Sequence, residues 1–550
     1  MNLLRDPWLP FQKRDGHTEY LPITSMTSPE VVDLALPRAD FQGAAYQFLI
    51  GLLQTAFAPG NSDVWMDRYE APPSEGELAE TLDAFAEGFE LEGGGPCFMQ
   101  DYESLEEEPA NSIAGLLIDS PGASTIQNNT DHFVKEGRAE AICPECAAIA
   151  LFTMQINAPS GGKGYRTGLR GGGPLTTLLM PASTTSTLWE KLWINVLKRD
   201  QLDGEQVSQA DPQVFPWMEP TRTSEKGQQV LPTHVHPLHV YWAMPRRYRL
   251  AFDNREAFCD LCGRQGSRMV TGLRARNYGN NYGGPWVHPL TPYRKDPKKP
   301  QEPPLSIKGQ PGGIGYRHWG SLVFSDEKGE GNLPAENVKD YPRKADECEA
   351  EDIALPRVAR LWAFGYDMDN MKPRGWVGTQ LPFLAMPESQ QERMQSWLRV
   401  MIGYASEVCR QLKRSTKEAW FKRPSEAKGD LDYIDSRFWE RTEQQFYDAL
   451  SELGSHLLDD DIERMPQALA QSWYLYVRKQ ALTIFDDLTL GGPPETLNLK
   501  RITRARNGFT GWFGKNKTTR NFRKLAGMDS LHEEGRSSGS RQTVTNKEQP

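Results

Sequence analysis

The sequence predicts an α+β protein: a large mixed α/β N-terminal domain with a zinc-knuckle region, a C-terminal four-helix bundle, and a basic, partly disordered tail. Short apolar runs broken by Gly and Pro continue to about residue 380, and apolar residues then recur at helical spacing. Two Cys-x-x-Cys pairs lie in the first part. The 550 residues also exceed what one hydrophobic core usually serves. We therefore expect three parts, 1–380, 386–492 and 493–550.

The first regular element that the N-terminal part predicts is a helix over residues 43–58. This stretch is rich in helix formers, and the Pro59-Gly60 pair that follows is a stop signal. The frequent Gly and Pro residues beyond it predict a domain with many loops.

The segment after Pro387 predicts an antiparallel helical bundle. A first amphipathic helix is indicated by apolar residues at helical spacing, namely Met394, Trp397, Leu398, Met401, Ala405, Val408 and Leu412. Two more helices are expected over about 433–457 and 462–488, with a shorter piece around 416–421. The run Gly491-Gly492-Pro493-Pro494 ends the bundle.

The tail, 493–550, has a composition of its own. From Lys500 to Lys524 it carries nine basic residues and no acidic residue, and four aromatic residues lie among them. Beyond Gly527 the Ser, Gly, Arg and Glu content predicts disorder. The sequence leaves open whether the basic segment contacts DNA, a partner subunit or nothing.

The overall composition restricts the kinds of partner that the chain can have. Sixty-three basic and seventy-three acidic side chains give a net charge of -10, so the average surface repels nucleic acid and any such role must be local. The longest apolar stretch, about 48–58, is too short to cross a bilayer, and the first residues hold no apolar signal core. We expect a cytoplasmic protein with no membrane partner.

Four of the seven cysteines form two pairs, Cys143 with Cys146 and Cys259 with Cys262. Two knuckles with two-residue gaps are typical of tetrahedral zinc with four thiolate ligands. A separation of more than a hundred residues weakens the signal, and unpaired buried thiols or redox chemistry are the alternatives. We favour one shared structural zinc, which would leave no open position for a catalytic water.

The sequence does not indicate an enzyme. His234, His236 and His239 form a rival metal cluster, but no nearby carboxylate completes a metallohydrolase pattern. There is no His-Glu-x-x-His motif, no Walker A loop and no nucleophile elbow.

The most unusual run is 160–173, in which seven glycines and three basic residues lie close together. It fails as a phosphate loop because no Ser or Thr follows Lys163. A loop without Cβ atoms brings backbone amides close to a ligand, and adjacent cations attract a phosphate backbone. The narrow minor groove of a duplex is a suitable target, and a flexible surface hairpin is the equally weighted alternative.

Several stretches together resemble the CasA family, the large subunit of the type I-E CRISPR surveillance complex Cascade. They are the opening 2–10, Leu36-Pro37-Arg38, the segment 96–100 and, most specifically, 143–177 with its glycine run. The order and spacing hold over about 490 residues, and the basic tail lies outside the match. The resemblance implies a C-terminal helical bundle and a non-catalytic subunit.

The resemblance also implies partners. Such a subunit sits at the crRNA 5′ end, recognises the protospacer-adjacent motif (PAM) in double-stranded DNA through the minor groove, starts strand separation and R-loop formation, and recruits the helicase-nuclease. Guide pairing reads the target, so the protein reads only a short motif and its shape. The implied partners are crRNA, target DNA, the helicase-nuclease, and the backbone, small, 5′-handle-binding and crRNA-processing subunits.

Carried over by position, the resemblance assigns individual residues. The minor-groove loop becomes Gly161, Gly162, Lys163 and Gly164, with Lys163 where the family often has glycine. The family's second groove contact is a lysine that is absent here, so Arg274, Arg276 or Asn277 must replace it. The family's wedge glutamine is also absent from 365–372, which leaves Asn370 or Met371. A loop that touches the crRNA falls in 125–140 and includes Gln127, Asn128, Asn129, His132 and Phe133.

Two hypotheses from other classes remain open at this level. A zinc-dependent nuclease or hydrolase would need an open metal site. A free-standing zinc-containing DNA-binding regulator would use the basic tail, and truncation at residue 492 would abolish its DNA binding.

Overall fold

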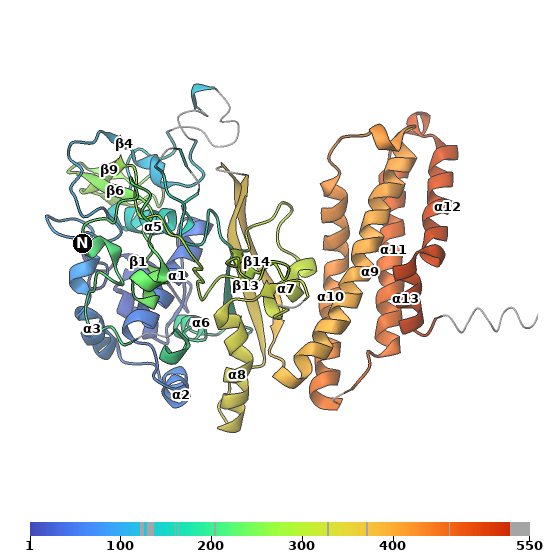
Figure 1. Ribbon diagram of the computed structural model, residues 1–550, viewed down its shortest axis with the longest axis horizontal. Coiled ribbons are helices and arrows are strands. Elements are labelled where there is room, and N and C mark those ends of the chain that lie inside the picture. The colour runs from blue at the N-terminus through green and yellow to red at the C-terminus, as the bar shows by residue number, and fades with distance from the viewer. Residues whose placement is uncertain are drawn as a thin grey trace, which may run out of the picture. The chain divides into compact units, whose positions relative to one another are not determined.

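The computed structural model has a mixed α+β fold with small sheets and a helical C-terminal region (Figure 1). It describes residues 1–121, 126–128, 137–159, 161–162, 164–202, 205–326, 329–369, 372–460 and 462–528. The chain divides into two compact units. Met1–Ile314 and Ser321–Ala385 form the first, which we call the mixed unit, and Gly315–Gly320 with the chain from Met386 onward form the second, the helical unit.

The core of the mixed unit is built around α1, Ala39–Ala56. This helix is apolar on nearly all sides and almost wholly buried, as expected for a helix at the centre of a domain. The Phe48 ring makes edge-to-face contacts with five other aromatic rings, those of Trp8, Phe89, Phe98, Phe152 and Trp242. These rings come from segments spread over more than 230 residues of the sequence. The aromatic cluster therefore joins distant segments of the mixed unit to one helix.

Other helices of the mixed unit, some of them short, are present in the part of the chain that the structure describes. They are α2 (Ser62–Glu70), α3 (Glu75–Asp83), α5 (Pro144–Asn157), α6 (Leu188–Trp193) and α8 (Glu336–Ala350). A short helix α7, Trp319–Val323, lies where the chain returns from the helical unit to the mixed unit. Helix α5 packs against α1, and Pro144 begins it at the position where a missing N–H costs nothing.

The strands of the mixed unit form several small antiparallel sheets. One has the order β2-β1-β3, from Thr18–Leu21, Leu9–Lys13 and Val31–Leu34. A second has the order β4-β9-β6, from Ala110–Ser112, Met269–Arg276 and Arg247–Asp253. Two-residue strands make up a sheet β11-β10-β12 and a hairpin β7-β8, from Leu305–Ser306, Tyr293–Arg294, Asn332–Leu333, Ala257–Phe258 and Gln265–Gly266.

The longest strands form the hairpin of β13, Val358–Asp369, and β14, Lys372–Leu384 (Figure 1). Strand β13 also pairs with the fully buried β5, Thr176–Pro181, so the sheet order is β14-β13-β5. The register runs from the open end of the hairpin to the Asp369–Lys372 pair, with a bulge after Asp367. The segment 365–372, expected to hold a wedge, therefore lies at the closed end of this hairpin.

The helical unit contains the amphipathic helices that the periodicity predicts. They are α9 (Glu388–Trp420), α10 (Asp432–Asp460) and α11 (Gln467–Leu490), and they pack side by side (Figure 1). The expected separate piece at 416–421 is wrong, because α9 continues without a break to Trp420. Its apolar stripe is continuous, and neither Gly nor Pro interrupts it after Gly403.

The segment assigned to a separate tail forms two further helices, which is a correction. Helix α12, Leu499–Lys515, packs on α9, and α13, Lys517–Leu525, packs on α9 and α11. Ile502, Ala505, Phe509 and Phe513 are buried and recur every three or four residues. The basic residues lie between these apolar positions. Counting charges alone therefore did not reveal that the segment is an amphipathic helix. The segment 529–550, part of the region expected to be disordered, lies outside the described residues.

A six-residue segment, Gly315–Gly320, also belongs to the helical unit, although it lies within the expected first domain. The Tyr316 ring stacks on Phe446 with centroids 4.5 Å apart. Its hydroxyl group lies 2.8 Å from Thr442 Oγ1 in a buried hydrogen bond. The buried Tyr316 thus helps to anchor this segment in the helical unit, together with Arg317, which stacks over the Trp439 ring. In the part of the chain described, no helix has the length and apolar character needed to cross a membrane.

Candidate nucleic-acid interface and metal centre

The four cysteines of the two pairs come together in the mixed unit, as the sequence predicts. The sulfur atoms of Cys143, Cys146, Cys259 and Cys262 all lie within 4.8 Å of one another. The Cys143 and Cys262 sulfurs are 3.7 Å apart. Tetrahedral zinc with bonds of about 2.3 Å would separate its sulfur ligands by about 3.8 Å. The donor set and its spacing therefore fit a metal that prefers four thiolates.

Each knuckle is formed by a different kind of local structure. Cys143 caps the N-terminus of α5, where its sulfur accepts a hydrogen bond from the Cys146 amide at 3.4 Å. Cys259 and Cys262 lie in the turn between β7 and β8, which Gly263 closes in the left-handed conformation at φ +75°. A carboxylate oxygen of Asp260 accepts hydrogen bonds from the amides of residues 140 and 141, so it ties the second knuckle to the chain before the first.

The surroundings favour deprotonation of the second pair of thiols. Hydrogen bonds from the Cys143 and Cys146 thiols lower the pKa of Cys262 to about 7 and also lower the pKa of Cys259. Arg264 stacks over the Tyr20 ring at 3.7 Å and forms an ion pair with Glu145 at 3.1 Å. Four converging thiols of this kind could bind a metal ion.

The glycine run follows α5 directly, so one continuous segment connects the first knuckle to the loop. The amide of Gly168 donates to the carbonyl of Ala158 at 3.0 Å, and the amide of Gly173 donates to that of Asn157 at 3.3 Å. These bonds hold together the two ends of a loop that projects from the end of α5. We call residues 159–166 the glycine loop.

The three glycines of this loop that the structure describes have different roles. A Cβ on Gly161 would lie 2.4 Å from the Cβ of Tyr165, so the loop's own packing requires glycine there. Gly164 has φ +80°, and a Cβ on it would lie 2.7 Å from the Cβ of Asn277. Gly162 is exposed, and a Cβ there would meet nothing within 4 Å. Lys163 lies outside the described residues.

The second predicted contact segment, 274–277, lies beside this loop. The amide of Tyr278 donates to the carbonyl of Gly164 at 2.8 Å, and the exposed Asn277 packs against Gly164. The two arginines of the segment are engaged elsewhere. Arg276 forms ion pairs with Glu103 at 2.5 Å and Glu108 at 2.8 Å.

The Arg274 side chain is also engaged, in this case by main-chain carbonyl oxygens. Its Nη1 donates to the carbonyls of Glu106 at 3.1 Å and Glu108 at 2.6 Å. Of the three candidates in 274–277, Asn277 is therefore the one whose side chain is exposed next to the glycine loop.

The closed end of the β13–β14 hairpin lies next to the base of the glycine run. A Cβ on Gly173 would lie 2.5 Å from Met368 Cγ, and Gly309 pairs with Asp367 as an isolated bridge. Arg374 forms an ion pair with Asp367 at 2.7 Å across the end of the hairpin. The predicted wedge residues Asn370 and Met371 lie outside the described residues, at this end.

The predicted crRNA-contact loop is described only in part. Gln127 and Asn128 are exposed. Asn129, His132 and Phe133 lie outside the described residues.

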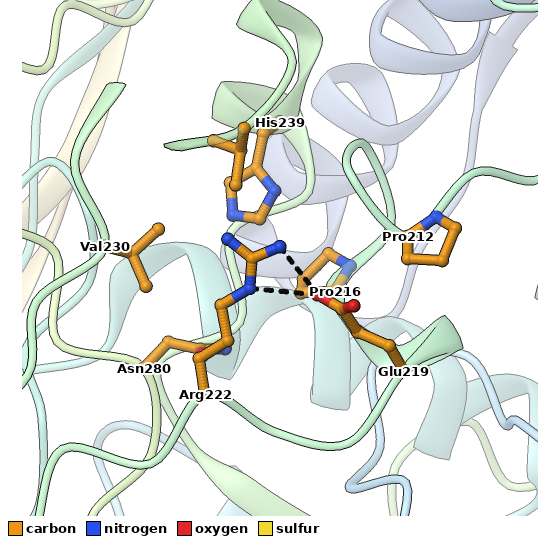
Figure 2. A pocket seen from close by; sticks show the side chains of 8 residues that line it. Pro212, Pro216, Glu219, Arg222, Val230, His239 and Asn280 are labelled. Carbon is orange, nitrogen blue, oxygen red and sulfur yellow. Dashed lines mark hydrogen bonds and ion pairs between the residues drawn. The ribbon is translucent and has the colours of Figure 1, made fainter. Parts of the chain in front are cut away.

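The rival histidine cluster is used for local structure. His239 is buried, and its ring nitrogens lie 3.2 Å from the Gln213 carbonyl and 3.1 Å from the Tyr282 hydroxyl. It lines a cavity of about 10 Å³, room for one water, in which Arg222 is paired with Glu219 (Figure 2). His234 and His236 each accept a backbone N–H through Nδ1. In the described residues, only the four cysteines form a cluster suited to a metal.

Sequence reasoning missed three residues around the glycine loop. Tyr165 and Arg246 contact each other beneath it, with the guanidinium carbon 4.8 Å from the ring centroid. Tyr278 bonds to the loop in the left-handed conformation at φ 64°. Tyr165 lies within the glycine run that the sequence had already singled out. No local sequence pattern distinguishes Arg246 or Tyr278.

Comparisons with known proteins agree with this fold. The model of the family described as CRISPR-associated protein Cse1 matches residues 2–484. The match covers most of the chain, and the protein therefore belongs to the Cse1 family, also called CasA, which confirms the resemblance drawn from the sequence.

Similar solved structures show the same fold. Thermus thermophilus CasA (Cse1) has a TM-score of 0.66 and 17% identity, covering 93% of this chain and 99% of that chain. Thermobifida fusca Cse1 has a TM-score of 0.63 and 17% identity, covering 96% and 98%. A chain of a CRISPR RNA-guided surveillance complex has a TM-score of 0.60 and 15% identity, covering 93% and 99%.

Proposed function

We propose that the chain is the large, non-catalytic subunit of a type I-E CRISPR ribonucleoprotein. In this role it recognises the PAM in double-stranded DNA through the minor groove, initiates strand separation and R-loop formation, and recruits the helicase-nuclease. Its partners are crRNA, target DNA and the other subunits of the complex. Membership of the Cse1 family and the fold shared with a chain of a surveillance complex support the assembly.

One observation carries the DNA-binding part of the proposal. The glycine loop and the segment 274–277, both assigned to the duplex from the sequence, are in contact, although more than a hundred residues separate them. The exposed Asn277 packs against Gly164, two residues from the exposed Gly162, and the closed end of the β13–β14 hairpin packs against Gly173 at the base of the glycine run. A duplex that met the glycine loop would therefore also meet Asn277, and one that extended along the run to Gly173 would reach the hairpin.

The chemistry of the loop suits the minor groove. This groove is about 6 Å wide, and a backbone without side chains can enter it where a bulkier loop would collide with its walls. Gly162 is the residue of the loop that adds no side-chain bulk at an exposed position. We assign it as the leading groove contact, with Gly161, Lys163 and Gly164 beside it.

The remaining roles follow from position. We assign Asn277 as the second groove contact, because Arg274 and Arg276 are already bound to main-chain oxygens and glutamates. Asn370 or Met371 at the end of the hairpin would act as the wedge, since apolar side chains unstack base steps at a cost of a few kcal/mol. The loop with Gln127, Asn128, Asn129, His132 and Phe133 would meet the crRNA, and the four cysteines would hold a structural zinc.

The decisive experiment changes Gly162 in the assembled complex. Gly162→Asp places a carboxylate where the groove floor and phosphates would lie, so steric and charge exclusion should abolish binding of a motif-bearing duplex. Gly94→Asp is the matched control, because Gly94 is also exposed and a Cβ there meets nothing within 4 Å. Duplex titrations of the copurified crRNA complexes measure the effect. Unchanged duplex binding by the Gly162 variant would refute the loop assignment.

A second pair of variants tests which residue of 274–277 faces the groove. Asn277→Ala should weaken binding of the motif-bearing duplex about tenfold, which is the loss of a base-edge contact of about 1–3 kcal/mol. Arg276→Ala should have a smaller effect, because its guanidinium is neutralised by Glu103 and Glu108. The reverse order of the two effects would assign the groove contact to the arginine.

A further inference from the structure

Arg246 is a buried cation directly beneath the glycine loop, and it forms no ion pair with any carboxylate that the structure describes. Its exposed fraction is 5%, and it immediately precedes β6. Nη2 donates to the carbonyl of Pro159, at the start of the loop. Nε and Nη1 have no hydrogen-bond partner among the residues that the structure describes. Burial lowers the pKa of this guanidinium, which shows how far it is removed from water.

The other two buried arginines of the described chain, Arg170 and Arg247, have no buried nitrogen without a hydrogen-bond partner. Arg247, the next residue, forms an ion pair with Asp101 at 2.5 Å. Arg170 also lacks a carboxylate, but its two terminal nitrogens make hydrogen bonds of 2.9–3.4 Å to Thr176, Thr291, Gln47 and the Ile156 carbonyl. A buried N–H without a partner is costly, more so on a charged group. Arg246 is thus an exception that its own fold does not explain.

The glycine loop itself covers this guanidinium. The Tyr165 ring lies over it at 4.8 Å, and Tyr165 is itself 39% exposed, so it is only partly packed into the protein. The missing Cβ of Gly161 would lie 3.2 Å from Nη1, so glycine at this position leaves room next to the free donor. Displacement of one aromatic side chain would bring Arg246 to the surface beside Gly162.

We propose that Arg246 binds a backbone phosphate of the duplex whose minor groove receives the glycine loop. This inference rests on the proposed function. When a loop enters the groove, the two sugar-phosphate walls pass on either side of it, within reach of groups at its base. A phosphate there replaces the Tyr165 ring as the partner of Arg246 and satisfies its free donors with charge-assisted hydrogen bonds. The buried cation then fixes the position of the duplex, while the loop reads the groove.

The test uses the assembled crRNA complex with Arg246→Gln, and Arg255→Gln as the control. Arg255 follows the other end of β6 and is exposed, so the control removes the same charge at a distance from the loop. Arg246→Gln should weaken duplex binding about tenfold or more. It should also reduce the slope of log K against log salt by about 0.9, the loss of one phosphate contact. Arg255→Gln should leave both unchanged.

Two measurements separate this role from a structural one. Thermal unfolding of the isolated Arg246→Gln protein should start no lower than that of the unaltered protein, because the substitution removes a buried unpaired charge. Arg246→Lys keeps the charge and should restore the salt slope. A neutral methylphosphonate, placed in turn at each phosphate beside the motif, should weaken the unaltered complex at one position and leave the Arg246→Gln complex unaffected there.

Several results would overturn the inference. An Arg246→Gln complex with unaltered affinity and salt slope excludes a phosphate contact, and a large loss of thermal stability makes Arg246 a structural brace. Loss of crRNA from the purified complex would assign the phosphate to the guide instead of the duplex. Failure of the inference alone would leave Gly162→Asp unable to bind duplex, whereas failure of the proposed function would leave that variant binding as well.

Discussion

The amide of Tyr278 donates a 2.8 Å hydrogen bond to the carbonyl oxygen of Gly164, joining two residues that lie 114 positions apart in the sequence. Tyr278 lies two residues beyond the end of β9, and Gly164 lies in the glycine loop that follows α5. The bond therefore connects the loop to the sheet β4-β9-β6. It adds a main-chain anchor to the contact between Tyr165 and Arg246.

This connection makes Gly164 and Gly162 unequal, although both are glycines of the same loop. Gly164→Ala forces a side chain into the left-handed region and against Asn277, so we expect a loss of about 1–2 kcal/mol in unfolding free energy. Gly162→Ala, the control, should change stability by less than about 0.5 kcal/mol. Denaturant unfolding of the two proteins measures the difference. Equal stability of both variants would contradict the geometry of the loop.

The four-cysteine cluster predicts one zinc ion per chain. Cys146→Ser should abolish zinc binding and lower the melting temperature, because three remaining thiolates hold the metal poorly. Cys97→Ser is the control, since Cys97 lies outside the cluster and a hydroxyl could replace its thiol next to the carbonyls of Gly93 and Gly95. Elemental analysis and thermal unfolding check both variants. Purified protein free of zinc in every preparation would remove the metal assignment.

The packing of α12 and α13 predicts that the C-terminal segment is part of the fold. Truncation after residue 492 removes Phe509, Phe513 and Phe522, each at most 3% exposed. Burial of three such rings contributes about 5–9 kcal/mol, so the helical unit should unfold far more easily or precipitate. Truncation after Met528 keeps every described helix and should behave as the full chain. A truncated protein that kept its helical unit intact would show that this segment is separable.

Buried His239 predicts an acid-sensitive contribution to stability. Burial lowers its pKa from 6.5 to about 3, and the nearby Arg222 acts in the same direction. Between these values the unfolded chain binds a proton that the folded chain does not. Stability therefore falls as the pH decreases through this window, by at most about 1.4 kcal/mol per pH unit for this one group.

The corresponding variant is His239→Gln, with His17→Gln at an exposed position as the control. In the His239 variant, the slope of the unfolding free energy against pH should be smaller between pH 6 and 4. The difference should correspond to the uptake of up to one proton fewer on unfolding. His288 and His318, whose pKa values are also lowered by burial, would still contribute. The His17 variant should keep the full dependence. An unaltered slope in the His239 variant would show that this side chain is protonated in the fold.

The sequence by itself determined the features that depend on local pattern or ligand chemistry. The spacing of Cys143, Cys146, Cys259 and Cys262 predicted one shared cluster, because four thiols in two knuckles suit one tetrahedral metal. Helical periodicity predicted α9, α10 and α11, since burial of one face requires that spacing. The glycine run predicted a loop, because glycine is unfavourable inside helices and strands.

Only the tertiary structure decided which candidate side chains are paired within the fold and which are exposed to a ligand. It pairs Arg276 with Glu103 and Glu108, which no local pattern relates to it, and leaves Asn277 exposed beside the glycine loop. It adds Tyr316 and α12 to the helical unit, and it places Arg246 beneath Tyr165. These relationships join residues tens to hundreds of positions apart. They arise because a side chain in the folded protein interacts with whichever groups lie near it in space. Neighbouring positions in the sequence do not specify those groups.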